Sequence, residues 1–145
     1  MKLGDPQFQS ALAMLSKTPL WSGLDDQDYG WILRFSEEHT YEAGNEIVKE
    51  GKAGTGFHLI LDGAVEIRSG GTSLAKLGPG QYFGEMSILD DEPASADVLA
   101  LEKSKCLVLS AAAFKTIVTQ NRAVTLKILR EFARRLRATN KSVLY

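Results

Sequence analysis

The chain is poor in residues that build disulfide-linked or metal-held structures, with one cysteine and two histidines among 145 residues. The single Cys106 excludes an internal disulfide, a four-cysteine iron–sulfur cluster and a zinc ribbon. His39 and His58 are too few for the ligand cluster of a metal-dependent enzyme, so we expect surface or hydrogen-bonded imidazoles. No histidine or arginine is adjacent to Cys106 to activate it as a nucleophile. We therefore expect no enzyme activity, no metal and no cofactor.

Long apolar runs are also missing. No stretch approaches the roughly 20 apolar residues that span a bilayer, and the first ten residues, MKLGDPQFQS, lack a secretory core. We expect a cytoplasmic protein that has no membrane partner. The composition of 44% hydrophobic and 24% charged residues is ordinary for a folded protein, and the length favours a single domain over 1–145.

The near-neutral charge of −1 conceals a basic C-terminal segment. Residues 122–145 carry seven basic residues and one acidic residue, a balance of +6 that leaves −7 for the first 121. Such a segment is typical of a solvated helix face, but it is also compatible with an acidic partner or with non-specific binding to nucleic acid.

Helices are expected at both ends of the chain, over 1–39 and 110–145. Phe8, Leu12 and Leu15 have helical spacing, and the segment 23–26 offers an N-cap carboxylate for a second helix that we expect to reach about Glu37. Ser110 is the expected cap of a third helix, and a fourth begins at Asn121.

The middle of the chain, 40–109, has a β pattern. Ten of the thirteen glycines fall between positions 44 and 84 and separate short apolar or alternating runs. The expected strands are 46–49, 57–61, 64–68, 74–77, 97–101 and 105–109. Short strands with glycine turns favour a sandwich or barrel, so the predicted fold is mainly β with flanking helices.

The last expected helix carries an apolar seam whose positions follow one another at alternating intervals of four and three residues. Positions 122, 126, 129, 133, 136, 140 and 143 hold Arg, Leu, Leu, Ala, Leu, Asn and Val. The seam can pack on the β body or pair with the same helix of a second chain, and Ile128 and Phe132 widen the stripe enough for both. A homodimer through this helix is one prediction, and packing within the chain is the other.

Several segments together resemble the cyclic-nucleotide-binding domain of catabolite activator proteins, protein kinase A regulatory subunits and nucleotide-gated channels. They are PLWSGL (19–24), YEAGNEIVKEG (41–51), FHLILDGAVEI (57–67), LGPGQYFGEMS (77–87), PASADV (93–98) and CLVL (106–109). The resemblance implies a jelly-roll β-roll around a pocket, with a phosphate-binding cassette over 83–98 and a terminal helix that caps the ligand or pairs two chains.

The resemblance also implies which residues bind the ligand, either cyclic AMP or cyclic GMP. In the family, the position of Gly84 permits close approach, that of Glu85 accepts a hydrogen bond from the ribose 2′-hydroxyl, and amides near the cassette helix face the phosphate. The implied ligand-binding residues are Phe83, Gly84, Glu85, Met86, Ser87, Ser95 and Ala96.

Two residues depart from the family pattern. Ala94 stands where most nucleotide-responsive members have an arginine on the phosphate, and Asp97 brings a negative charge. Losing a charge-assisted hydrogen bond costs about 1.5–3 kcal/mol, and a carboxylate about 5 Å from the phosphate adds about 3 kcal/mol of repulsion at an effective dielectric of 20. We expect weakened binding, unless Arg68, Lys76, Lys103 or a base from the terminal helix replaces the missing charge.

The sequence therefore predicts a non-catalytic regulatory module that senses a ligand. The alternative is a degenerate sensor that serves as a dimerisation or docking module for an unknown effector protein. Specific DNA binding is not expected, because the helix-turn-helix that follows this helix in catabolite activators has no counterpart before Tyr145. Phe132 and Tyr145 are candidate caps over the ligand, although packing is the expected role of Phe132.

Overall fold

A computed structural model describes residues 6–139, and two four-stranded antiparallel sheets form its centre. The strand orders are β1-β8-β3-β6 and β2-β7-β4-β5. The strands are β1 (Ser36–Tyr41), β2 (Glu46–Val48), β3 (Phe57–Asp62), β4 (Val65–Ser69), β5 (Thr72–Leu77), β6 (Tyr82–Phe83), β7 (Asp97–Ala100) and β8 (Ser104–Leu109). The predicted sandwich with flanking helices is confirmed.

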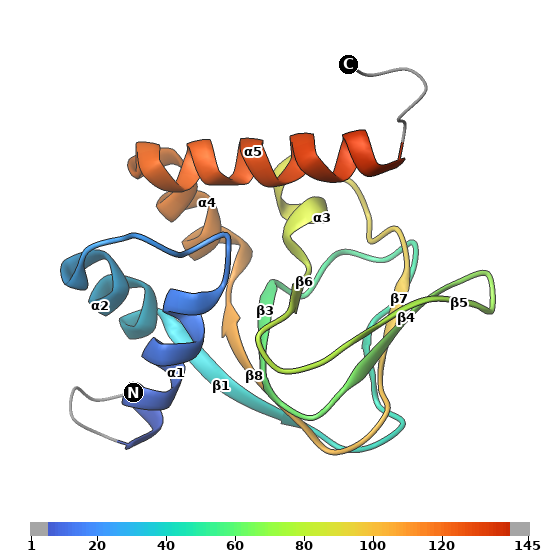
Figure 1. The fold of residues 1–145 in the computed structure, drawn as a ribbon. Coiled ribbons are helices and arrows are strands. Elements are labelled where there is room, and N and C mark those ends of the chain that lie inside the picture. Colours follow the sequence, from blue (N-terminus) through green and yellow to red (C-terminus); the bar gives the residue numbers. More distant parts are fainter. Residues whose placement is uncertain (1–5, 140–145) are drawn as a thin grey trace.

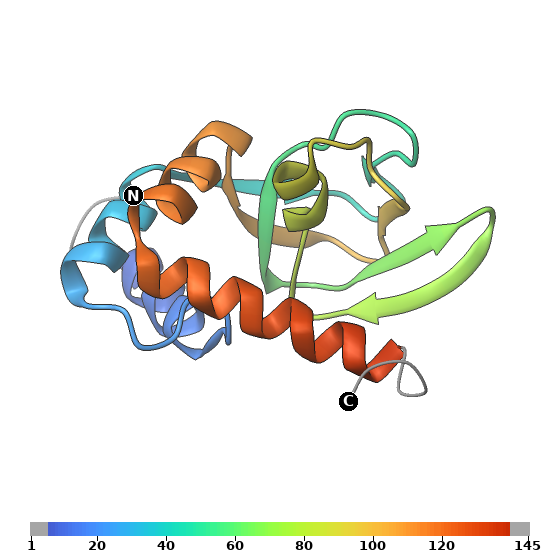
Figure 2. The same ribbon diagram turned by 90° about the horizontal axis from the view of Figure 1, so that it is seen from above.

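Three of the four larger helices gather on one side of the β-roll, and the last one runs from that side across the roll, as Figures 1 and 2 show. The four are α1 (Pro6–Lys17), α2 (Asp26–Arg34), α4 (Ala111–Gln120) and α5 (Arg122–Thr139), while the short α3 (Glu85–Asp90) follows β6 within the roll. None of these described helices is long and apolar enough to cross a membrane.

Two apolar clusters hold these layers together. The first lies where the helices meet the sheet of β1, β8 and β3, and it centres on the fully buried Trp21, whose ring makes edge contacts with Phe57 and Phe114. The second fills the space between the sheets and includes Ile60 and Cys106. Burial raises the pKa of the Cys106 thiol to about 12, so this cysteine is a small core residue without thiolate character.

The second helix ends earlier than the sequence predicts. It was expected to reach about Glu37, but α2 ends at Arg34 and β1 begins at Ser36. All six residues of β1 pair with β8, from Ser36 opposite Leu109 to Tyr41 opposite Ser104. Pairing with a strand some 70 residues away is a tertiary effect, and it overrides the helical spacing of this segment.

The caps of the C-terminal helices agree with the prediction. The Ser110 hydroxyl accepts a hydrogen bond from the backbone N–H of Ala113 at 3.1 Å, and the Asn121 side chain accepts one from Val124 at 3.2 Å. Ser110 thus caps the start of α4, and Asn121 lies at the junction between α4 and α5.

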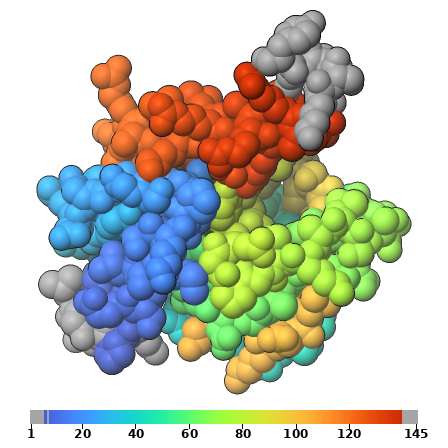
Figure 3. All heavy atoms as spheres, viewed as in Figure 1, coloured from blue at the N-terminus to red at the C-terminus, as the bar shows by residue number. Residues whose placement is uncertain are grey.

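Helix α5 crosses from the helical side to the β-roll and lies along one edge of the molecule, as the space-filling view in Figure 3 shows. One face buries Val124 and Ile128, and Phe132 packs on the same cluster, which confirms packing for this ring. The predicted seam lies on the other face, where Leu126, Leu129 and Leu136 are 46%, 61% and 52% exposed. Its positions 140 and 143, like Tyr145, lie outside the described residues.

Candidate ligand-binding cavity

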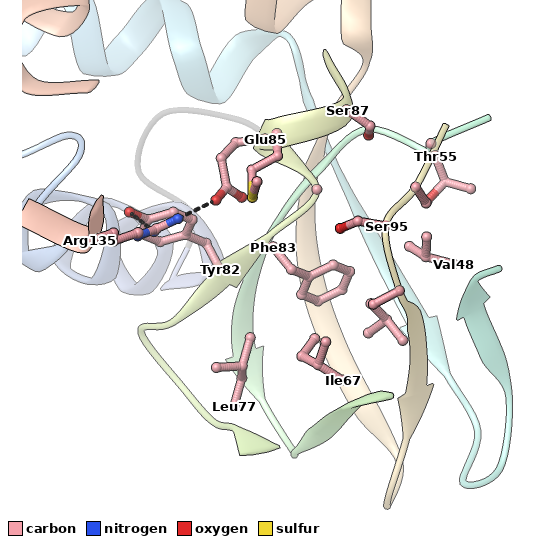
Figure 4. Close-up of a pocket in the computed structure, with 16 residues that line it drawn as sticks. Val48, Thr55, Ile67, Leu77, Tyr82, Phe83, Glu85, Ser87, Ser95 and Arg135 are labelled. Carbon is pink, nitrogen blue, oxygen red and sulfur yellow. Dashed lines mark hydrogen bonds and ion pairs between the residues drawn. The ribbon is translucent and has the colours of Figure 1, made fainter. Parts of the chain in front are cut away.

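The predicted cassette forms one wall of a cavity of about 390 Å³ at the end of the β-roll (Figure 4). All seven residues predicted to bind a ligand line this cavity: Phe83, Gly84, Glu85, Met86, Ser87, Ser95 and Ala96. The structure thus brings them together, while their part in binding stays a prediction. The cavity falls within the size range of small-molecule sites.

Gly84 determines the path of the chain into the cavity. Its φ angle is +95°, and a β-carbon on it would lie 2.1 Å from the carbonyl oxygen of Gly56. Any other residue would therefore clash with the backbone as well as adopt an unfavourable conformation. The contact brings the start of α3 against β3 and aims Glu85 into the cavity.

Most of the cavity wall is apolar. The apolar side chains come from several strands and from the cassette: Val48, Ile67, Leu77, Phe83, Met86, Ala94, Ala96 and Val98. Met86 is 52% exposed, so part of this wall is open to solvent. A ligand with an apolar or aromatic body would bury surface here.

One ion pair dominates the polar side of the cavity. Glu85 Oε1 accepts a hydrogen bond from Arg135 Nη1 of α5 at 2.8 Å, and the Glu85 side chain is only 7% exposed. Arg135 Nη2 donates to the Tyr82 hydroxyl, also at 2.8 Å, and the guanidinium lies over the Tyr82 ring. Among the described residues, Glu85 and Arg135 are the only charged side chains that line the cavity, and they neutralise each other.

The ionisation of these groups follows from their surroundings. Burial alone would lower the pKa of Arg135, but the hydrogen bond with Glu85 and the nearby negative groups raise it above its usual value. Burial raises the pKa of Tyr82 to about 12, which keeps its hydroxyl protonated. The Arg135 guanidinium therefore stays charged, and the Tyr82 hydroxyl stays uncharged, at any physiological pH.

The other polar groups of the cavity are uncharged. Thr55, Ser87 and Ser95 place hydroxyls in the wall, and Figure 4 shows them on the side away from Arg135. Ala94 lies beside them and is 8% exposed; its backbone N–H and C=O bond to Lys52 and Gly51, both at 2.9 Å. These backbone bonds keep position 94 in the cavity wall whatever side chain it bears.

Asp97 is not among the lining residues, contrary to the expected repulsion of a phosphate. Its carboxylate accepts a hydrogen bond from the Glu50 backbone N–H at 2.7 Å. In β7, side chains alternate between the two faces, so that Ala96 and Val98 line the cavity and Asp97 lies on the opposite face.

The three cations named as replacements for the missing charge do not line the cavity either: Arg68, Lys76 and Lys103. Arg68 instead pairs with Glu66. The terminal helix does supply a base, Arg135, at a position the sequence did not identify. Arg135 lies seven residues after the buried Ile128, and an arginine on the buried side of an amphipathic helix was the available signal.

A fully buried histidine lies behind the cassette. His58 Nδ1 donates to the Gly56 carbonyl at 3.1 Å, Nε2 accepts from the Tyr41 hydroxyl at 2.9 Å, and the ring stacks on Phe83 with centroids 4.7 Å apart. Burial lowers the pKa of His58 to about 4. The neutral imidazole thus supports the strand and carbonyl against which Gly84 packs.

A scan against protein families matches residues 38–121 to the family described as "Cyclic nucleotide-binding domain". Among curated proteins, the cyclic AMP receptor protein of Thermus thermophilus is 32% identical over 125 residues, 83% of this chain and 58% of that protein. Among solved structures, the catabolite activator protein of Thermus thermophilus aligns with a TM-score of 0.77 and 32% identity, covering 86% of this chain and 61% of the other.

A third similar structure is the N-terminal domain of a transcriptional regulator from Streptomyces coelicolor. It has a TM-score of 0.73 and 30% identity, and the match covers 91% of this chain and 96% of that one. The chain spans 58% of the length of the Thermus thermophilus cyclic AMP receptor protein and 23% of a cAMP-dependent protein kinase regulatory subunit from Eremothecium gossypii.

Proposed function

The chain belongs to the cyclic nucleotide-binding domain family, and we propose that it is a non-catalytic sensor with weak affinity for cyclic AMP and cyclic GMP. The observation that carries this proposal is the charge of the cavity. Its described charged groups, Glu85 and Arg135, are paired with each other, and Ala94 provides no cation for a phosphate.

The expected loss of affinity follows from this arrangement. A charge-assisted hydrogen bond contributes about 1.5–3 kcal/mol, which corresponds to about 10- to 150-fold in affinity. Arg135 can reach an anion only by leaving Glu85, and an unpaired carboxylate that is 7% exposed is itself costly. The repulsion once expected from Asp97 plays no part, because its carboxylate faces away from the cavity.

The same ion pair connects the cavity with α5. Hydroxyl groups of a ligand at Glu85 would share or replace the hydrogen bond that Arg135 makes, and any change there acts on the C-terminal half of the helix. A ligand shifts the equilibrium between two positions of α5 only when it binds the chain more tightly with the helix in one position than in the other. The exposed face of Leu126, Leu129 and Leu136 is the output surface for a second copy or an effector protein.

Calorimetry on the whole chain tests the affinity. We expect cyclic AMP and cyclic GMP to bind far more weakly than low micromolar, and Ala94→Arg to strengthen cyclic AMP binding by about tenfold or more. Ala112→Arg is the matched control, because it adds the same charge at an exposed site on α4, away from the cavity. Low-micromolar binding of either nucleotide by the unaltered chain would contradict the proposal.

The second candidate is a docking module that needs no nucleotide, and the exposed leucine face of α5 favours it. In its homodimeric form, light scattering at tens of micromolar protein should give twice the mass of the chain, since assembly depends on concentration. A mass equal to one chain would reject the homodimer. The same mass together with calorimetric binding of a ligand would favour the sensor.

A further inference from the structure

We propose that the cavity selects a neutral ligand that carries neighbouring hydroxyl groups on a heteroaromatic body, which is the chemistry of a ribonucleoside without phosphate. The inference rests on the proposed sensing function and specifies the class of ligand. Three features of the cavity carry it: its charge, its hydrogen-bonding groups and its apolar wall.

The first feature is the balance of charge. Glu85 and Arg135 form a 2.8 Å pair, so the described wall has no net charge. A neutral ligand leaves this pair intact. An anion would either enter without a counter-charge or draw Arg135 away and leave the buried carboxylate unpaired, and both alternatives carry a desolvation cost.

The second feature is the free capacity of Glu85. Oε1 accepts the hydrogen bond from Arg135, whereas Oε2 accepts none from residues 6–139. An ionised carboxylate accepts several hydrogen bonds, so Oε2 can accept from a ligand hydroxyl while the ion pair remains. Two neighbouring hydroxyls on one ligand would match the two oxygens of this carboxylate.

The hydrogen-bonding groups away from Arg135 are also neutral. The hydroxyls of Ser87 and Ser95 can donate and accept, and the Thr55 hydroxyl, which donates to the Ile47 carbonyl at 3.4 Å, can accept; this set suits an alcohol such as a hydroxymethyl group. Ala94 beside them contributes no donor from its side chain. A phosphate at this place would meet uncharged groups alone, whose hydrogen bonds are about half as strong as charge-assisted ones.

The third feature is the apolar wall. Ile67, Leu77 and Val98 come from three strands and line the cavity together with Phe83. Figure 4 shows Ile67 and Leu77 on the same side of the cavity as the Phe83 ring. A flat heterocycle buries apolar surface against such a wall, which favours its binding. The ligand would thus have an aromatic body on the strands, its diol at Glu85 and its alcohol near the serines.

The test is a set of calorimetric titrations of the whole chain with adenosine, guanosine, 2′-deoxyadenosine, cyclic AMP and cyclic GMP. We expect adenosine or guanosine to bind at least about tenfold more tightly than the matching cyclic nucleotide. The 2′-deoxy compound should bind at least about fivefold more weakly than adenosine, because it lacks one of the hydroxyls that Glu85 accepts.

Two variants examine the charge argument separately. Ala94→Arg should reverse the preference towards cyclic AMP, and Arg135→Gln should weaken cyclic AMP more than adenosine. Arg134→Gln is the matched control, because Arg134 pairs with Glu131, is 69% exposed and does not line the cavity. Thermal unfolding of each variant shows whether it is folded.

The outcomes separate this inference from the proposed function. Cyclic nucleotides that bind weakly, yet more tightly than nucleosides, would overturn the inference and leave the sensor proposal standing. Low-micromolar cyclic AMP binding would overturn the sensor proposal, and with it the neutral-ligand inference unless adenosine binds more tightly still. A failure of all five compounds to bind would overturn the inference in favour of the docking module.

Discussion

Acidification should destabilise the fold through a single buried histidine, His58. The pKa of this imidazole is about 4 in the folded chain against an ordinary value of 6.5. Between these values the unfolded chain binds the proton and the folded chain does not, so stability falls as the pH falls. The difference of about 2.5 pKa units corresponds to about 3 kcal/mol, fully present above pH 6.5 and lost by about pH 4.

Denaturant unfolding from about pH 7.5 to about pH 4, followed by the fluorescence of the buried Trp21, measures this loss. His58→Phe keeps the stacking on Phe83 and removes the titration. It should lower stability at neutral pH, since the Tyr41 hydroxyl and the Gly56 carbonyl lose their partner, but its acid loss should be about 3 kcal/mol smaller than in the unaltered chain.

His39→Asn is the matched control, because the other histidine of the chain is 43% exposed at its side chain and lies on β1. Its acid loss should be close to that of the unaltered chain, because the charge of His39 is the smallest of the causes that set the pKa of His58. If His58→Phe is too unstable to measure, Tyr41→Phe retains the buried imidazole and should retain the steep acid loss. Identical pH profiles for the His58→Phe and unaltered chains would refute the reasoning.

Three further predictions concern the cavity and α5. Gly84→Ala should lower the free energy of unfolding in denaturant by more than about 2 kcal/mol, since its β-carbon would lie 2.1 Å from a carbonyl oxygen. Gly44→Ala is also at positive φ but has open space around it, so it should cost only about 1 kcal/mol. Equal losses for the two variants would contradict this. Arg135→Gln should lower stability by about 1 kcal/mol, because the guanidinium is 42% exposed, and speed hydrogen exchange after residue 132, whereas Arg134→Gln should change neither. Leu129→Glu should abolish any dimer seen by light scattering and leave the unfolding midpoint almost unchanged, because this side chain is 61% exposed; a stable dimer in this variant would place the interface elsewhere.

The β-roll was predictable because its strands carry local signals. The glycine turns and the alternating runs from Glu46 to Leu109 correspond to six of the eight strands. Ser110 is a cap as expected, Asp25 is the cap within the predicted segment 23–26, and Asn121 caps the helix that was expected to begin there. The two missed strands, β1 and β6, lack such signals. β1 is polar and follows a helix, and the two residues of β6 are assigned by their pairing with β3.

The composition of the cavity was partly predictable. The cassette residues adjoin one another in sequence, and all seven line the cavity. The sequence indicates the helical face of Arg135 but not its contact with Glu85, because 50 residues separate the two and the contact depends on how α5 packs. The orientation of Asp97 was misjudged for a related reason, since the alternation of β7 turns its side chain away from Ala96 and Val98.

The central claim is that residues 6–139 place no cation in the cavity that is free to hold a phosphate. The most direct test compares the dissociation constant of cyclic AMP for the unaltered chain with that for Ala94→Arg. The account predicts that the unaltered chain binds cyclic AMP weakly and that the variant binds it at least about tenfold more tightly. This gain is what one added charge-assisted hydrogen bond would give. Equal, low-micromolar dissociation constants for both would contradict it. The phosphate would then be held without an arginine at position 94.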